Sequence, residues 1–185
     1  MSDNFNRASF SNPEFWTALT GSPAIVSSTY WQAAGISAAG TIFEMQTDNI
    51  RGEFVVANRQ SSGKTVVMIC CGPAFNSVNV GLELETGFFN NNYHIITNNG
   101  LSFSDGSRVD HGQTVQSVVN GDTIAFTYTA SSNTFTTYYN GTQVSTWVDS
   151  GNLVSHGPGR RYCGIVQSSD SNTGVGVDSV RFYNF

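Results

Sequence analysis

Two acidic residues, Glu83 and Glu85, lie two positions apart in the strand-like run Val78–Glu85. Because successive side chains of a strand point to opposite faces, both carboxylates would lie on one face, with Cα atoms roughly 6.7 Å apart. Glycoside hydrolysis uses two carboxyl groups about 5–5.5 Å apart for retention, or about 6.5–9.5 Å apart for inversion. The pair is therefore a candidate for glycan hydrolysis, and a solvated strand face is the alternative.

Aromatic side chains supply the candidates for glycan binding. Aromatic rings stack on the apolar faces of sugars, while Asn, Asp and Gln side chains hydrogen-bond the hydroxyl groups. The candidates are Trp31, Tyr93, Tyr138 and Trp147, with Asp149 close to the last of them. Each aromatic residue has core packing or covering of a sheet as its alternative role, and Asp149 could instead hydrogen-bond a neighbouring turn.

No metal centre or other cofactor is predicted. The three histidines, His94, His111 and His156, lack the spacing of metal ligands. Clusters of Asp and Asn occur at Asp48-Asn49 and at Asp170-Ser171-Asn172. Turn chemistry explains these clusters, and calcium binding is the alternative because calcium takes six to eight oxygen ligands.

Charge and cysteine content limit the partners and the compartment. Charged residues make up 11% of the chain and the net charge is −5, so the basic patch that nucleic acid requires is absent. The first 20 residues show neither a basic start nor an apolar core, and no apolar run is long enough to span a membrane. Cys70 and Cys71 would face opposite sides of a strand, and with Cys163 we expect three buried, reduced thiols made in a bacterial cytoplasm.

The elements that position these residues are predicted to be short antiparallel strands. In Thr123–Ala130 every second residue is large and apolar, and Asn140-Gly141 supplies the two positive-φ residues of a type I′ hairpin turn. Turn-forming residues separate nine further strand-like runs, namely Pro23–Tyr30, Thr41–Gln46, Gly52–Asn58, Thr65–Cys71, Val78–Glu85, Tyr93–Thr97, Val115–Val119, Tyr162–Val166 and Gly174–Asn184. One short helix is expected at Pro13–Leu19, with Asn12 as its cap. The prediction is an all-β, antiparallel β-sandwich jelly roll, formed as one domain over residues 1–185.

The order of several short motifs resembles that of a known family. An opening Asp-x-Phe-Asn-Arg, a later Asn-Gly followed by Trp-x-Asp, and a closing Gly-Pro-Gly-Arg-Arg-Tyr-x-Gly-Ile are similar to minor tail proteins of phages that infect mycobacteria and related actinobacteria. The matching residues are Asp3, Phe5, Asn6, Arg7, Trp16, Asn140, Gly141, Trp147, Asp149, Gly157, Arg161, Gly164, Asp178 and Phe182. The resemblance implies a domain of the concanavalin A-like lectin/glucanase superfamily, in which the concave sheet carries a glycosidase site, a sugar-binding groove or neither.

The resemblance also sets the functional expectation. The glucanases of that superfamily place an extra Asp and a third acid beyond the first glutamate pair, whereas Thr86-Gly87-Phe88-Phe89 follows Glu85 here. We therefore expect a virion structural protein that is not an enzyme and docks on other tail or capsid proteins, with host-envelope glycan as a secondary partner. Neither nucleic acid nor membrane is an expected partner, and self-association is left open. The alternatives are a glycan hydrolase using Glu83 and Glu85, or a free bacterial lectin-like module.

Overall fold

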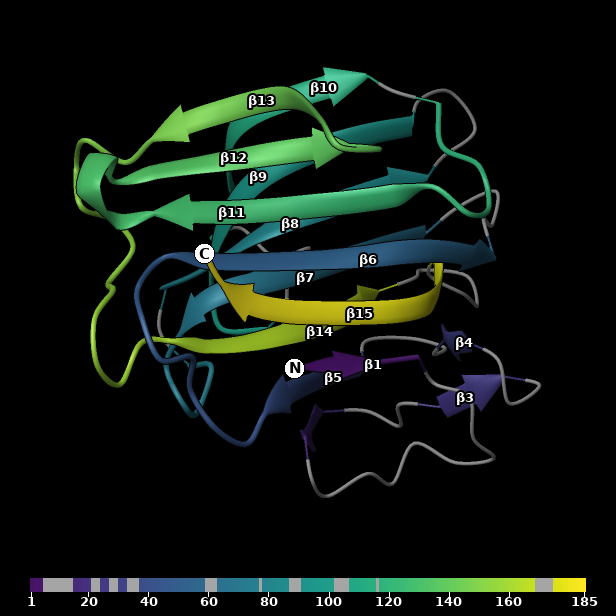
Figure 1. Cartoon of the computed structure of the whole chain (residues 1–185), viewed down its shortest axis with the longest axis horizontal. Coiled ribbons are helices and arrows are strands. Elements are labelled where there is room, and N and C mark those ends of the chain that lie inside the picture. The colour runs from purple at the N-terminus through teal and green to yellow at the C-terminus, as the bar shows by residue number, and fades with distance from the viewer. Residues whose placement is uncertain are drawn as a thin grey trace.

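Two antiparallel sheets pack face to face in a sandwich (Figure 1). The computed structural model describes residues 1–4, 15–20, 24–26, 30–32, 37–58, 63–76, 78–86, 91–101, 107–115, 117–168 and 175–185. The eight-stranded sheet has the order β13 (Thr142–Val148), β12 (Thr134–Tyr139), β11 (Thr123–Thr129), β6 (Ile50–Asn58), β15 (Gly176–Asn184), β4 (Tyr30–Gln32) and β3 (Ala24–Val26), and β1 (Ser2–Asp3) also pairs with β15. The seven-stranded sheet has the order β10 (Val109–Val115), β9 (Asn91–Asn99), β8 (Val78–Thr86), β7 (Gly63–Cys71), β14 (Tyr162–Ser168), β5 (Ser37–Thr41) and β2 (Trp16–Thr20).

The main core lies between the two sheets and follows the predicted alternation. Ile124, Phe126 and Tyr128 on β11 are all buried in it. They meet the inward residues of the other sheet, among them Leu82 and Leu84 on β8. Burying these side chains is the dominant favourable term in folding, at about 25 cal/mol for each Å² of apolar surface removed from water. The sequence-based prediction of an all-β sandwich is confirmed.

The seven-stranded sheet is buried on its outer face as well. A second cluster on that face joins Val66, Met68, Cys71, Phe75 and Ile96, with two further members, Ala38 and Val166. Gly40 and Gly164 make room for the Phe75 ring, because a Cβ atom on either glycine would lie within 3.0 Å of it. The outer face therefore carries an apolar cluster around Phe75.

The hairpin between β12 and β13 forms as the sequence predicts. Asn140 and Gly141 have φ values of 46° and 81°, as a type I′ turn requires. The predicted irregularity near Asp178 is also present, because the register of β15 against β6 shifts between Val177 and Ser179. The two ends of the chain meet in one sheet, where Ser2 and Asp3 pair with Arg181 and Val180.

The predicted helix at Pro13–Leu19 is wrong. Pro13 lies outside the described residues, and Trp16–Thr20 is strand β2, which pairs with β5. Trp16 is 4% exposed and packs edge-on against Phe182 across the core. Pairing with β5 and burial of Trp16 outweigh the local capping signal. Among the described residues the helical content is one 3-10 turn, Ala130–Ser132.

Two predicted strands extend beyond the real ones. The run Thr41–Gln46 contains only the last residue of β5, and the run Val115–Val119 contains only the last residue of β10. Pro23–Tyr30 overlaps two short strands, β3 and β4. The small residues Ala38, Ala39 and Gly40 gave no strand signal in the sequence, although all of β5 is buried. No helix in the described part of the chain is long and apolar enough to cross a membrane.

Candidate functional site

Glu83 is the centre of a charged cluster on the outer face of the seven-stranded sheet. It stands between Leu82 and Leu84, which point into the main core, so its own side chain points outward. The strand register sets Glu83 opposite Val66 on β7 and His94 on β9. Its side chain has no exposed surface, which is unusual for a carboxylate and requires charged partners.

Arg108 provides the closest of those partners. Its Nη2 atom donates to Glu83 Oε1 at 2.7 Å, and the same nitrogen lies 3.0 Å from Asp110 Oδ1. Lys64 Nζ lies 3.9 Å from Glu83 Oε1, from the neighbouring strand β7. Both cations contact the same carboxylate oxygen, Oε1. Nearby positive charges favour the ionised form of a carboxyl group, whereas burial disfavours it.

Asp110 links this cluster to His94 and to the solvent. Its Oδ1 atom is 3.6 Å from His94 Nδ1, and its side chain is 49% exposed whereas that of His94 is 8% exposed. Because Glu83 and Asp110 each contact Arg108 Nη2, their two oxygens lie no more than about 6 Å apart. The arrangement therefore holds two carboxylates, one buried and one accessible, at a single guanidinium nitrogen.

Sequence reasoning found one member of this cluster and missed four. Glu83 was a candidate, but the side chain of its predicted partner, Glu85, lies outside the described residues, and its backbone pairs with Lys64. The residues of the cluster come from β7, β8, β9 and the start of β10. Only the pairing of these strands in the sheet brings them together. The signal that the sequence did contain is the i, i+2 spacing of Arg108 and Asp110, which places both on one face of a strand.

The predicted glycan-binding residues do not gather at one place. Trp147 stacks on His111, with ring centroids 3.8 Å apart, and also on Phe135, at 5.3 Å. The Arg51 guanidinium lies over the Tyr138 ring at 4.7 Å, on the outer face of the eight-stranded sheet. Strands β4 and β9 carry Trp31 and Tyr93, whose side chains lie outside the described residues. Glycan contact by these aromatic residues stays a prediction.

Asp149 organises a turn at the end of β13. Its carboxylate is fully buried and accepts the backbone N–H groups of Leu153 and Val154 at 2.9 and 2.8 Å. The backbone carbonyl of Asp149 accepts a third bond, from the Asn133 side chain at 2.6 Å. These contacts match the turn-bonding role that was the alternative for this residue.

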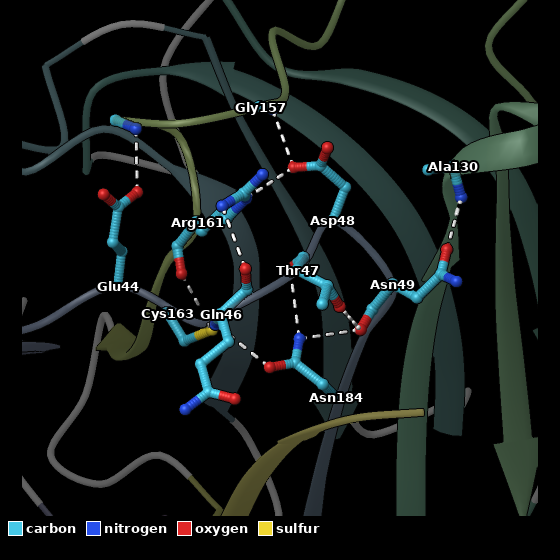
Figure 2. A network of polar contacts seen from close by, with 11 residues as sticks. Glu44, Gln46, Thr47, Asp48, Asn49, Ala130, Gly157, Arg161, Cys163 and Asn184 are labelled. Carbon is cyan, nitrogen blue, oxygen red and sulfur yellow. Dashed lines mark hydrogen bonds and ion pairs between the residues drawn. The ribbon is translucent and has the colours of Figure 1, made fainter.

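A second polar network lies where the segment 42–49 meets the loop before β14 (Figure 2). Asp48 Oδ1 accepts bonds from Arg161 Nε at 2.7 Å and from the Gly157 N–H at 2.9 Å. The hydrogen bond from Arg161 holds the pKa of Asp48 below its usual value. Asn49 Oδ1 accepts the N–H of Ala130 at 2.9 Å. The Asp48-Asn49 pair thus serves protein contacts, and no group of three His, Cys, Asp or Glu side chains suited to a metal occurs among the described residues.

Solved structures that resemble this chain include glucanases and a carbohydrate-binding module. A β-1,3-1,4-glucanase (lichenase) from a mouse hindgut metagenome has a TM-score of 0.66 at 9% identity, covering 100% of this chain and 99% of its own. A β-glucanase of Bacillus licheniformis has a TM-score of 0.64 at 11% identity, with 100% and 98% covered. A carbohydrate-binding module of Bacillus subtilis has a TM-score of 0.57 at 13% identity, with 94% of each chain covered. No protein-family model and no curated protein sequence matches the chain.

These likenesses define the fold as a concanavalin A-like jelly roll of the kind found in glucanases and carbohydrate-binding modules. They also correct one expectation. The sequence predicted a protein that is not an enzyme, but the structures that share its fold over the whole chain include several glucanases, which are hydrolases. The expectation failed because it relied on the acids that follow the first glutamate along one strand. In the structure, the carboxylate that shares Arg108 with Glu83 is Asp110, on β10.

Proposed function

We propose that this protein is a glycan hydrolase that acts at the outer face of the seven-stranded sheet. The observation that carries the proposal is the pairing of Glu83 with Asp110 around Arg108 Nη2. A retaining glycosidase uses two carboxyl groups about 5–5.5 Å apart, and the upper limit of about 6 Å on the distance between Glu83 Oε1 and Asp110 Oδ1 is compatible with that spacing. The glucanase fold of the chain supports the same reaction class.

The two carboxylates would take different roles because their surroundings differ. Glu83, whose Oε1 atom contacts Arg108 and Lys64, would attack the anomeric carbon and form a glycosyl ester. Asp110, which is 49% exposed, would protonate the departing glycosidic oxygen and then take a proton from the water that hydrolyses the ester. Glu83 is buried beneath Arg108, so the incoming glycan has to displace the Arg108 side chain before the attack.

The substrate class we propose is a neutral β-linked glucan. Enzymes that share this fold include a β-1,3-glucanase and a β-1,3-1,4-glucanase. A chain with 13 acidic and 8 basic residues has no excess positive charge to hold an anionic polymer. A neutral polysaccharide fits this charge balance.

Release of reducing ends from β-1,3-glucan and mixed-linkage β-glucan tests the proposal. We expect the unaltered protein to release them, and Glu83→Gln and Asp110→Asn each to reduce kcat by at least about 100-fold. Glu85→Gln distinguishes the pair Glu83/Asp110 from the alternative pair Glu83/Glu85. If Glu83 and Asp110 are the catalytic pair, the Glu85→Gln variant should stay active. Glu53→Gln is a matched control, since Glu53 is ion-paired with arginines on the opposite sheet.

Two results would contradict the proposal. One is the absence of reducing ends from every glucan by a folded protein, whether or not the glucan is bound. The other is full activity of Glu83→Gln. Circular dichroism and the unfolding midpoint show whether each variant is folded, and Asp110→Asn carries the test if the buried Glu83→Gln variant is not.

The order of motifs shared with phage minor tail proteins supports a separate proposal about place. We propose that the module is carried on a phage virion, docked on other virion proteins, where it meets glycan of the host envelope. Mass spectrometry of purified particles from the source phage would detect the chain at a fixed stoichiometry to the tail or capsid proteins. Its absence from washed particles would reject this placement and leave the hydrolase proposal intact.

A further inference from the structure

A cavity of about 430 Å³ lies at the end of the sandwich where the segment 42–46 faces the last residues of β15. Its lining includes Phe43, Glu44, Met45 and Gln46 on one side and Asn184 on the other. The volume falls within the range of about 300–1,000 Å³ that is typical of small-molecule sites. None of the five residues of the charged cluster around Glu83 contributes to the lining, so the cavity is a different site.

One wall of the cavity is the paired end of β15, whereas the segment 42–46, which belongs to no strand, is held in place by hydrogen bonds from elsewhere in the chain. Asn184 locks one wall, because its Oδ1 accepts the Gln46 N–H at 3.0 Å and its Nδ2 donates to the carbonyls of Thr47 and Asn49 (Figure 2). On the other wall Glu44 Oε2 accepts the N–H of Gly159 at 2.7 Å. A binding site that is fixed before its ligand arrives loses less entropy on binding.

Arg161 adds a third fixed contact behind the cavity. Its backbone carbonyl accepts the Met45 N–H at 3.0 Å, and its guanidinium donates to the Gln46 carbonyl at 3.0 Å. The segment therefore keeps its shape although it belongs to no strand. The sequence predicts a strand at Thr41–Gln46. In the structure, residues 42–46 form a loop that hydrogen bonds hold in place.

The groups that face the cavity suit a neutral sugar. The Phe43 ring is 38% exposed and is steadied edge-on by Phe15, with centroids 6.3 Å apart. The Gln46 side chain is exposed, and its amide both donates and accepts hydrogen bonds. Glu44 offers carboxylate oxygens as acceptors for hydroxyl groups. One aromatic face beside a carboxylate and an amide is the combination that binds a ring with an apolar face and an equatorial set of hydroxyls.

We infer that this cavity is a second glycan-binding site, which takes one or two sugar units of the polymer whose hydrolysis is proposed at Glu83. The choice of a glucan as the ligand rests on the proposed function, whereas the cavity and its lining do not. Such a site would hold the polymer on the protein while a distant segment of the same polymer reaches the charged cluster. Its effect on hydrolysis would then be confined to long substrates.

Methionine methyl groups report separately on the two sites. Of the three methionines of the chain, Met1 and Met45 line the cavity, and Met68 belongs to the outer-face cluster of the seven-stranded sheet. We would titrate the protein, labelled with carbon-13 at the methionine methyls, with glucose and with the β-1,3- and β-1,4-linked glucose disaccharides. The expected result is a saturable shift of the Met45 methyl signal with no shift of the Met68 signal.

Variants of the cavity make the assignment specific. Phe43→Ala and Gln46→Ala should each raise the dissociation constant of the sugar, measured in this titration, on the order of tenfold. Gln143→Ala is the matched control, because Gln143 is an exposed glutamine on the edge strand β13 and should leave the titration unchanged. Hydrolysis of a short oligosaccharide should be the same in Gln46→Ala as in the unaltered protein, whereas hydrolysis of the insoluble polymer should slow.

The possible outcomes separate this inference from the proposed function. A shift of Met68 alone would place the sugar on the outer face of the sheet and would overturn the cavity as a glycan site while supporting the proposed function. A blank titration with all three sugars would also overturn it, and the reducing-end assay would still decide the hydrolase proposal. A Met45 shift without any hydrolysis would support the cavity and overturn the hydrolase.

Discussion

At the scale of single residues, the distinguishing feature is a carboxyl group, that of Glu83, which is fully buried beside two cationic side chains. Removing Glu83 from water is costly, and contacts with Arg108 and Lys64 compensate only if the geometry is good. A purely structural ion cluster is often replaceable by apolar packing without loss of stability. A Glu83→Leu, Arg108→Met double variant that folds well but loses all activity would therefore mark the cluster as functional.

His111 gives a residue-scale prediction about pH. Its ring stacks on Trp147, and its Nε2 lies 2.7 Å from Thr97 Oγ1. Burial lowers the pKa of His111, although the charges of Asp149 and Asp110 act in the opposite direction. The unfolded chain, with a histidine pKa of about 6.5, therefore takes up a proton before the folded chain does. The contribution of neutral His111 to the free energy of unfolding is fully present above about pH 6.5 and is lost as the pH falls below that value.

Urea unfolding at a series of pH values between about 7.5 and 5.5 measures this contribution. We expect the free energy of unfolding to fall less steeply with decreasing pH in His111→Gln than in the unaltered protein, by up to about 1.4 kcal/mol per pH unit. Parallel curves for the two proteins would show that His111 does not titrate differently in the folded and unfolded states.

At the scale of elements, the hairpin between β12 and β13 depends on the backbone conformation of Gly141. A Cβ atom added there would meet nothing within 4 Å, so the φ of 81° is the only cost of a larger residue. We expect Gly141→Ala to lower the free energy of unfolding by about 1–2 kcal/mol. Gly151→Ala is the control, since Gly151 does not have a positive φ and its Cβ would make an ordinary contact with Leu153 at 3.7 Å. Equal unfolding midpoints for the two variants would contradict the prediction.

The same hairpin shows what the sequence could predict and what it could not. Asn140-Gly141 and the alternation around it are local signals, and the strands they predict are present. The charged cluster depends instead on the register between β7, β8, β9 and β10, which no short window of sequence encodes. The sequence predicts a strand at Val115–Val119, whereas the real strand β10 spans Val109–Val115. The sequence therefore does not place Asp110 beside Glu83. The strand β5 was missed for a different reason, since its small residues serve the packing of Phe75 and Leu19.

At the scale of the whole molecule, the seven-stranded sheet separates two apolar clusters. Cys70 belongs to the main core between the sheets, whereas Cys71 belongs to the cluster on the outer face. Adjacent residues thus sample opposite sides of the sheet, as the sequence predicted. Cys163, on β14, is buried in the main core as well. All three cysteines are free thiols.

These thiols predict how the molecule reacts with a disulfide reagent such as DTNB. Burial raises the pKa of Cys70, Cys71 and Cys163 and excludes the reagent, and the thiolate is the reactive form. We expect no labelling of the native protein, and three labelled thiols for each chain once urea unfolds it. Cys70 and Cys71 lie on opposite sides of one sheet, so labelling both requires both sides to open. We therefore expect both thiols to be labelled at the rate at which the tryptophan signal is lost on unfolding. Ser150→Cys, at an exposed position, is the positive control and should add one thiol that reacts at once. Labelling of Cys71 ahead of Cys70 and Cys163 would contradict cooperative unfolding, and would show that the outer cluster opens while the sandwich between the sheets stays closed.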